Sequence, residues 1–312
     1  MTIDELKMVF KTIKAQVRPE QWEIALMSYG YNKRKDICSY QFRLLDLNPD
    51  CALPNLVKDI CGKCLTTLEE YESIEPYTGI TQTNIVYSFS DENELIADSY
   101  SGLKKKLANP DDTTKIEKMK MKGYAITGEI HLKNKPLPIK MFSLSLPFKT
   151  LKHQFFYSEG TYKEISEPVL SLQTSICLLV IDKTLYMLNT IAEKLFNLDR
   201  SFKRVSATHV DQVIAGMILN NPETFRGLAT SGFNPRTLIS FSNERLAFLQ
   251  NETNRQLFAR KYKLDLDAKG LFITDNPEQV RALVKVLCGK AMEDPMDSRP
   301  VEVPSSKAWV TR

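Results

Sequence analysis

The sequence predicts an α+β fold, with a mixed α/β N-terminal half containing β-meanders and a mostly helical C-terminal half. Three patterns in the 312 residues lead to this prediction. Apolar residues at helical spacing open the chain, a period of two begins near Lys118, and helical spacing returns near residue 190. Hydrophobic residues make up 43% of the chain, enough to form one large or two medium cores.

The N-terminal half alternates between helices and strands. Residues 2–16 predict an amphipathic helix, because apolar residues recur there every three to four positions. The next helix covers about 53–71, residues 72–81 are expected to be a loop, and residues 91–110 predict a helix with Asp91 as its N-cap. Apolar and aromatic runs predict strands at 22–31, 40–48 and 84–90.

β-structure dominates the middle of the chain. Residues 118–148 read as a hairpin or meander with a turn at 133–136, and further strands follow at 153–160 and 168–189. Within the last of these, Asp182-Lys183 separates two apolar runs as a tight turn would.

The C-terminal part returns to helical patterns. Helices are expected at 190–199, 207–218, 221–232, 242–262 and 276–290, with a short strand at 270–274. We therefore divide the chain at a soft boundary into a mixed region, 1–165, and a hairpin-plus-helical region, 166–312. One continuous core is the alternative.

The sequence also bears on the class of protein. No apolar run approaches the roughly 18 residues that a membrane span requires, and the N-terminus carries acids where a secretory signal would be basic. We therefore expect a cytoplasmic protein. Cys61 and Cys64 form a CxxC pair, which is compatible with half a zinc site or a dithiol. Because helical spacing continues through them, we expect both cysteines to be buried on a helix.

Positive charge is concentrated in one segment. The chain has a net charge of only +4, but residues 104–140 hold ten lysines and four acids. This segment therefore carries +6, and the other residues sum to −2. Local clustering of one sign creates the field that an anion-binding surface needs.

The spacing of these lysines indicates contacts to a nucleic-acid backbone. On a helix, Lys104–Lys106 would fan out around the exposed side, and on a strand the lysines of 118–122 would share one face about 6.6 Å apart. Few aromatic residues accompany them, which favours a duplex over a stacked single strand. Lysine rather than arginine favours phosphate neutralisation over base reading. The candidate DNA-binding residues are Lys104, Lys105, Lys106, Lys115, Lys118, Lys120, Lys122, Lys133 and Lys135.

Other functions of the same residues stay open. The lysines are also compatible with a solvated surface, an anionic membrane surface or an acidic protein partner. Glu129 and Lys133 suggest a metal-dependent nuclease, although their spacing is two residues longer than the Glu-x-Lys of such enzymes. The three histidines have no metal-ligand spacing, and we expect no catalytic residue, metal or cofactor.

Two C-terminal stretches resemble a known family. Residues 175–199 join an apolar hairpin to a helix with Glu193, Lys194 and Phe196, and residues 270–294 place a strand before a leucine-rich helix. The chain resembles the KwaB family of the Kiwa anti-phage defence systems. The resemblance implies a DNA-binding effector that hinders phage DNA replication or transcription and acts with a membrane-embedded partner, KwaA. The resemblance does not identify any DNA-contact residue in this chain. We also expect a homodimer, because two patches on one assembly raise the effective concentration of each.

Overall fold

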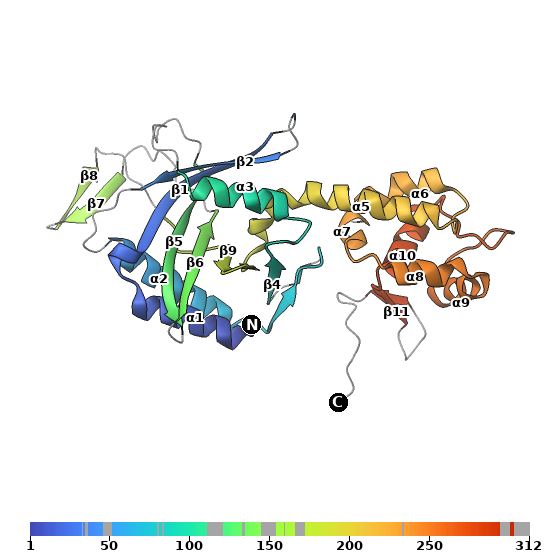
Figure 1. Cartoon of the computed structure of the whole chain (residues 1–312), viewed down its shortest axis with the longest axis horizontal. Coiled ribbons are helices and arrows are strands. Elements are labelled where there is room, and N and C mark those ends of the chain that lie inside the picture. The colour runs from blue at the N-terminus through green and yellow to red at the C-terminus, as the bar shows by residue number, and fades with distance from the viewer. Residues whose placement is uncertain are drawn as a thin grey trace. The chain divides into compact units, whose positions relative to one another are not determined.

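The computed structural model describes residues 1–32, 34, 37–45, 52–79, 81–82, 84–110, 121–132, 135–144, 154–158, 160–165, 172–232, 234–293 and 300–302. The chain forms two compact units (Figure 1). The first comprises Met1–Pro76 and Thr83–Asn197, and the second comprises Tyr77–Gln82 and Leu198–Arg312. A mixed sheet in the first unit and helices in the second confirm the predicted α+β class.

An eight-stranded sheet organises the first unit. Its strands are β1 (Trp22–Asn32), β2 (Ile37–Leu44), β3 (Ser73–Pro76), β4 (Ile85–Ser90), β5 (Gly123–Leu132), β6 (Lys135–Ser143), β9 (Leu178–Ile181) and β10 (Thr184–Met187). They are ordered β2-β1-β5-β6-β9-β10-β4-β3, and all neighbours are antiparallel except β3 and β4. The pair β9–β10 lies inside this sheet, so the first unit extends past residue 165.

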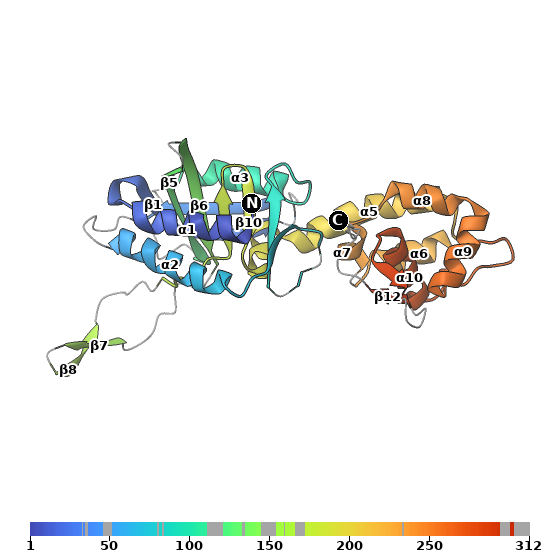
Figure 2. The same ribbon diagram turned by 90° about the horizontal axis from the view of Figure 1, so that it is seen from below.

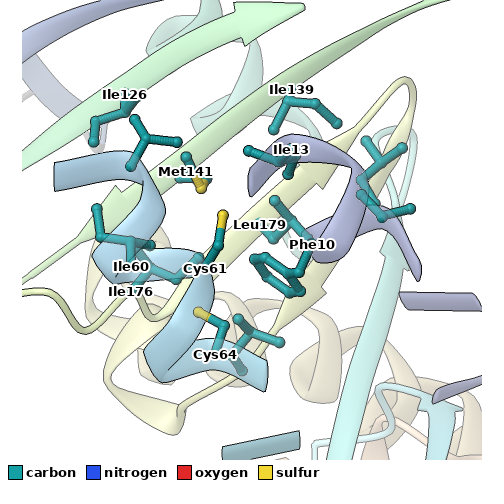
Figure 3. Packing of buried hydrophobic residues seen from close by; sticks show 14 of the residues in the cluster. Phe10, Ile13, Ile60, Cys61, Cys64, Ile126, Ile139, Met141, Ile176 and Leu179 are labelled. Carbon is teal, nitrogen blue, oxygen red and sulfur yellow. The ribbon is translucent and has the colours of Figure 1, made fainter. Parts of the chain in front are cut away.

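Two helices cover one face of the sheet. α1 (Ile3–Gln16) and α2 (Ala52–Leu68) lie side by side across it (Figure 2). Thr2 and Glu5 form a capping box that fixes the start of α1. The apolar stripes of both helices meet alternate residues of the central strands in one core (Figure 3).

Cys61 and Cys64 lie in this core, as the helical spacing predicted. Both are buried on α2 beside residues such as Phe10 (Figure 3). Burial raises the pKa of the Cys61 thiol to about 12 and also raises that of Cys64. Reactive cysteines lie in electropositive, partly exposed surroundings, so the apolar burial of both residues is typical of structural cysteines.

A third helix lies against the other face. α3 (Ala97–Leu107) packs beside β2, where Gly102 lies against the ring of Tyr40. The Tyr40 hydroxyl donates a hydrogen bond of 2.8 Å to the Leu195 carbonyl in α4 (Glu193–Phe196). Tyr100 of α3 contacts Phe196 edge to face, so α3 and α4 are joined across this end of the sheet.

The second unit is mostly helical. Its elements are α5 (Leu198–Ala215), α6 (Pro222–Ala229), α7 (Asn234–Leu238), α8 (Asn243–Gln250), α9 (Glu252–Tyr262), α10 (Pro277–Leu287), β11 (Ala291–Glu293) and β12 (Pro300–Glu302). Side-chain N-caps start four of these helices, at Asn221, Ser242, Asn251 and Asn276. Their apolar faces enclose a separate core.

Short elements complete the chain. The first unit also contains the 3₁₀ helices η1 (Pro19–Gln21) and η3 (Thr190–Ala192) and a separate hairpin of β7 (Gln154–Ser158) and β8 (Thr161–Ile165). Most expected elements occur within a few residues of their predicted bounds. The helices expected at 190–199 and 207–218 are instead a short α4 followed by one long helix, α5.

Four other expectations were wrong in detail. The loop predicted at 72–81 contains β3. Its backbone hydrogen-bond partners come from parallel pairing with β4, which the composition of this short polar segment does not indicate. The single helix expected at 242–262 is broken at Asn251, whose extended backbone ends α8 and whose side chain caps α9. Residues 270–274 form only isolated bridges through Phe272. In the predicted strand 118–122, Met121 and Lys122 precede the start of β5.

Candidate nucleic-acid interface

The C-terminal turn of α3 carries three consecutive lysines. Leu103 is buried against the sheet, and Lys104, Lys105 and Lys106 are exposed around the outer side of the helix, as expected. Within the described part of the chain, neither Lys105 nor Lys106 forms an ion pair. Their charges are favourable at a helix C-terminus, and both ammonium groups are open to an external anion.

Lys104 is partly compensated within the protein. Its Nζ atom lies 3.3 Å from an Asp91 carboxylate oxygen and 5.0 Å from the centre of the Tyr100 ring. Asp91 was predicted to cap α3, but the helix begins later, at Ala97, without a side-chain cap. Turns at residues 91–96 separate Asp91 from the helix start, so its carboxylate is free to hold Lys104.

Lys140 adds a further cation on this face of the sheet. It lies on β6 between the buried residues Ile139 and Met141, so its side chain points to the face that α3 covers. Partial burial lowers the pKa of the Lys140 ammonium group, and the charge of Lys104 acts in the same direction. Among the described residues, no carboxylate forms an ion pair with Lys140.

Lys140 belongs to the charged segment but is not among the DNA-binding residues that the sequence predicts, because it lies inside an apolar strand. The alternation of side chains along a strand could have identified it, because a lysine between two core residues must face away from that core.

Lys122 is held within the protein. Its Nζ atom donates a hydrogen bond of 2.7 Å to the backbone carbonyl of Tyr29 and lies 4.9 Å from the centre of the Tyr29 ring. These contacts satisfy one of its three donors and stabilise the charge, so Lys122 offers less to a ligand than Lys105 does.

Lys135 lies elsewhere in the first unit. It begins β6 opposite Leu132, at the far end of the β5–β6 hairpin from Lys122. Ten residues of strand at about 3.4 Å per residue separate the two positions by about 34 Å. Lys135 is exposed, and its register places it on the same face as Ile139, opposite to Lys140. Lys135 therefore does not share a surface with the end of α3. Lys115, Lys118, Lys120 and Lys133 lie outside the described residues.

The nuclease hypothesis rests on Glu129 and Lys133, of which the structure describes only Glu129. Glu129 is exposed on β5, and its carboxylate lies 4.0 Å from Nε2 of His131. Lys133 falls outside the described residues. No group of three acids, histidines or cysteines in the described ranges is arranged to hold a metal ion.

We expect removal of the Lys140 charge to change how the protein responds to phosphate. Lys140→Met relieves the cost of a partly buried cation beside Lys104, so short-chain polyphosphate should raise the melting temperature of the variant less than that of the wild type. Between the lowered pKa and the ordinary value of 10.5, the unfolded chain binds more protons at this site. Wild-type stability should therefore rise with pH in that window, and the variant should lack this contribution.

Lys135→Met is the matched control for this experiment. It removes the same charge from the opposite face and the far end of the hairpin. An equal loss of the polyphosphate effect in both variants would contradict a local site at Lys140.

Searches for similar proteins give no further assignment. Among the described residues, no helix combines the length and apolarity needed to cross a bilayer. Comparison with protein-family models, with curated proteins and with solved structures found no match.

Proposed function

We propose that this protein is a cytoplasmic DNA-binding effector of an anti-phage defence system. It binds the backbone of duplex DNA without strong sequence specificity and hinders phage DNA replication or transcription. A membrane-embedded partner of the KwaA type recruits it to the inner face of the membrane, and the effector acts as a homodimer. The resemblance to the KwaB family supports the biological setting, and the lysines support the ligand.

The observation that carries the DNA proposal is the uncompensated charge at the end of α3. Lys105, Lys106 and Lys140 have no carboxylate partner among the described residues, and Lys104 shares its charge with Asp91. Like charges held close together repel in the absence of an anion, and a phosphodiester backbone relieves this repulsion. An ordinary solvated surface would more often place acids among these lysines.

The side chains also argue against base reading. Lysine is a point charge on a flexible stem, whereas bidentate recognition of guanine uses the planar fork of arginine. Lys104, Lys105 and Lys106 project from a helix end with no arginine in α3. Binding should therefore depend on phosphate density and be similar for all duplex sequences.

A gel shift with the purified protein alone, on duplex and single-stranded DNA over a salt series, tests this proposal. Four neutralised phosphates would give a slope of log K against log salt of about −3.6, and each further contact would steepen it by about 0.9. We expect tighter binding to the duplex than to the single strand.

Two outcomes would favour the rival functions. Absence of a shift at low salt would leave an acidic protein as the partner of the lysines and would contradict DNA binding. Cleavage of plasmid in Mg²⁺ or Mn²⁺, abolished by Glu129→Ala, would establish a nuclease.

A further inference from the structure

β2 is an edge strand, and no described strand pairs with its outer side. It is the first strand of the eight-stranded sheet and pairs only with β1 among the described strands (Figure 1). The register with β1 runs without a bulge from Leu44, opposite Ala25, to Ile37, opposite Asn32. An edge of this length offers a row of backbone donors and acceptors to another strand.

The register identifies the backbone groups that point outward. The Leu45 amide donates to the Ile24 carbonyl at 2.9 Å, so residues 45, 43, 41, 39 and 37 direct their backbone groups toward β1. The alternate residues Cys38, Tyr40, Phe42 and Leu44 direct theirs away from the sheet. In the described part of the chain these outward groups make no hydrogen bond.

The edge lacks the features that usually prevent pairing. Residues 37–44 contain no lysine, acid or proline, and Arg43 is their single charge. Ile37 is 53% exposed and Leu44 is 41% exposed. Natural edge strands are commonly protected by charges, proline or bulges, so an open edge with exposed apolar ends indicates a partner.

We propose that β2 pairs antiparallel with β2 of a second copy, about a two-fold axis at Gln41. This register pairs Cys38 with Leu44 and Tyr40 with Phe42 of the other copy, so all four outward-facing residues exchange backbone hydrogen bonds. It also places the exposed Ile37 opposite Leu45 and the exposed Leu44 opposite Cys38, which covers both apolar side chains.

The pairing has a consequence for the lysines of α3. A two-fold axis perpendicular to the sheet makes the two β2 strands antiparallel and joins the two sheets into one continuous sheet. Each face of the joined sheet is then formed by the same face of both copies. Because α3 packs beside β2, both lysine-bearing helices lie on one side of the dimer. This consequence rests on the proposed DNA-binding function, whereas the strand pairing itself does not.

A cysteine at the axis tests the register. Gln41 would face Gln41 of the other copy in a non-hydrogen-bonded pair, with Cα atoms about 4.5 Å apart, a separation that a disulfide spans. Under mild oxidation, we expect Gln41→Cys to shift most of the protein to twice the chain mass of 35.7 kDa on non-reducing gels. Wild-type protein is the control for any cross-link that the native cysteines form.

Neighbouring positions provide matched controls. Ser39 and Arg43 face each other across the axis, so Ser39→Cys or Arg43→Cys alone should not cross-link, whereas a mixture of the two should. Equal cross-linking of all single variants, or a monomeric mass by light scattering for the wild type, would overturn the pairing.

The DNA gel shift is an independent readout. Cross-linking without a DNA shift would refute the proposed function and leave the pairing intact. A DNA shift without cross-linking of Gln41→Cys would refute the pairing alone.

Discussion

Replacing Lys105 and Lys106 together by glutamate should weaken binding to duplex DNA by about two to three orders of magnitude at low salt. The double charge reversal changes four unit charges at the proposed phosphate contacts, each worth about 1 kcal/mol in water, and about 1.4 kcal/mol corresponds to a tenfold change in affinity. Both side chains are exposed and form no ion pair within the described residues, so the fold should be retained. Gel shifts over a salt series measure the loss, and the slope should become shallower by about 1.8.

The matched control reverses two charges on the opposite face of the first unit. Lys11 of α1 and Lys58 of α2 are exposed, and their replacement by glutamate changes the net charge by the same amount. A similar loss of affinity in this control would show that DNA responds to net charge, and would contradict an interface at the end of α3.

The exposure of the candidate lysines could be predicted from the sequence where local periodicity determines it. The helical spacing around Leu103 placed Lys104–Lys106 on the outer side of α3, and the structure confirms it. Lys122 and Lys135 are close in the sequence but far apart in the structure. They lie at opposite ends of β5–β6, because a hairpin separates residues that are near in sequence by the length of its strands.

Contacts between distant segments account for most other differences. The pairing of β9 and β10 into the sheet of the first unit, the hydrogen bond from Lys122 to Tyr29 and the ion pair between Lys104 and Asp91 all depend on tertiary packing. A periodic pattern specifies which face of an element is buried, but it does not specify which distant element covers that face.

The second large effect concerns Arg255, a buried residue of α9 that no sequence pattern singled out. Its Nε atom donates to the Gly270 carbonyl at 2.8 Å, and its Nη1 atom donates to the Leu249 and Gln250 carbonyls at 3.1 and 2.7 Å. The last carbonyls of a helix have no partner within the helix, so Arg255 satisfies the end of α8 and joins it to the turn at Gly270.

Arg255→Met should destabilise the second unit by about 2–4 kcal/mol, because it removes the donor from the buried Leu249 carbonyl and from the partly buried Gln250 and Gly270 carbonyls. A buried acceptor left unpaired costs about 1–3 kcal/mol, and a partly buried one costs less. Arg255→Lys should recover only part of this, since one ammonium group cannot reach Gly270 and the end of α8 as a planar guanidinium does. Hydrogen–deuterium exchange measures the effect locally, with faster exchange expected in α8, α9 and residues 267–271.

Arg260→Met separates this role from a general loss of charge. Arg260 is exposed on the same helix, so its replacement should leave exchange in the second unit close to wild type. Peptides of α1 and α2 report on the first unit, whose core is separate, and they should be unchanged in every variant. Normal protection of α8 in Arg255→Met would mean that the three carbonyls find other partners, and that this guanidinium is not what joins the helix end to the turn.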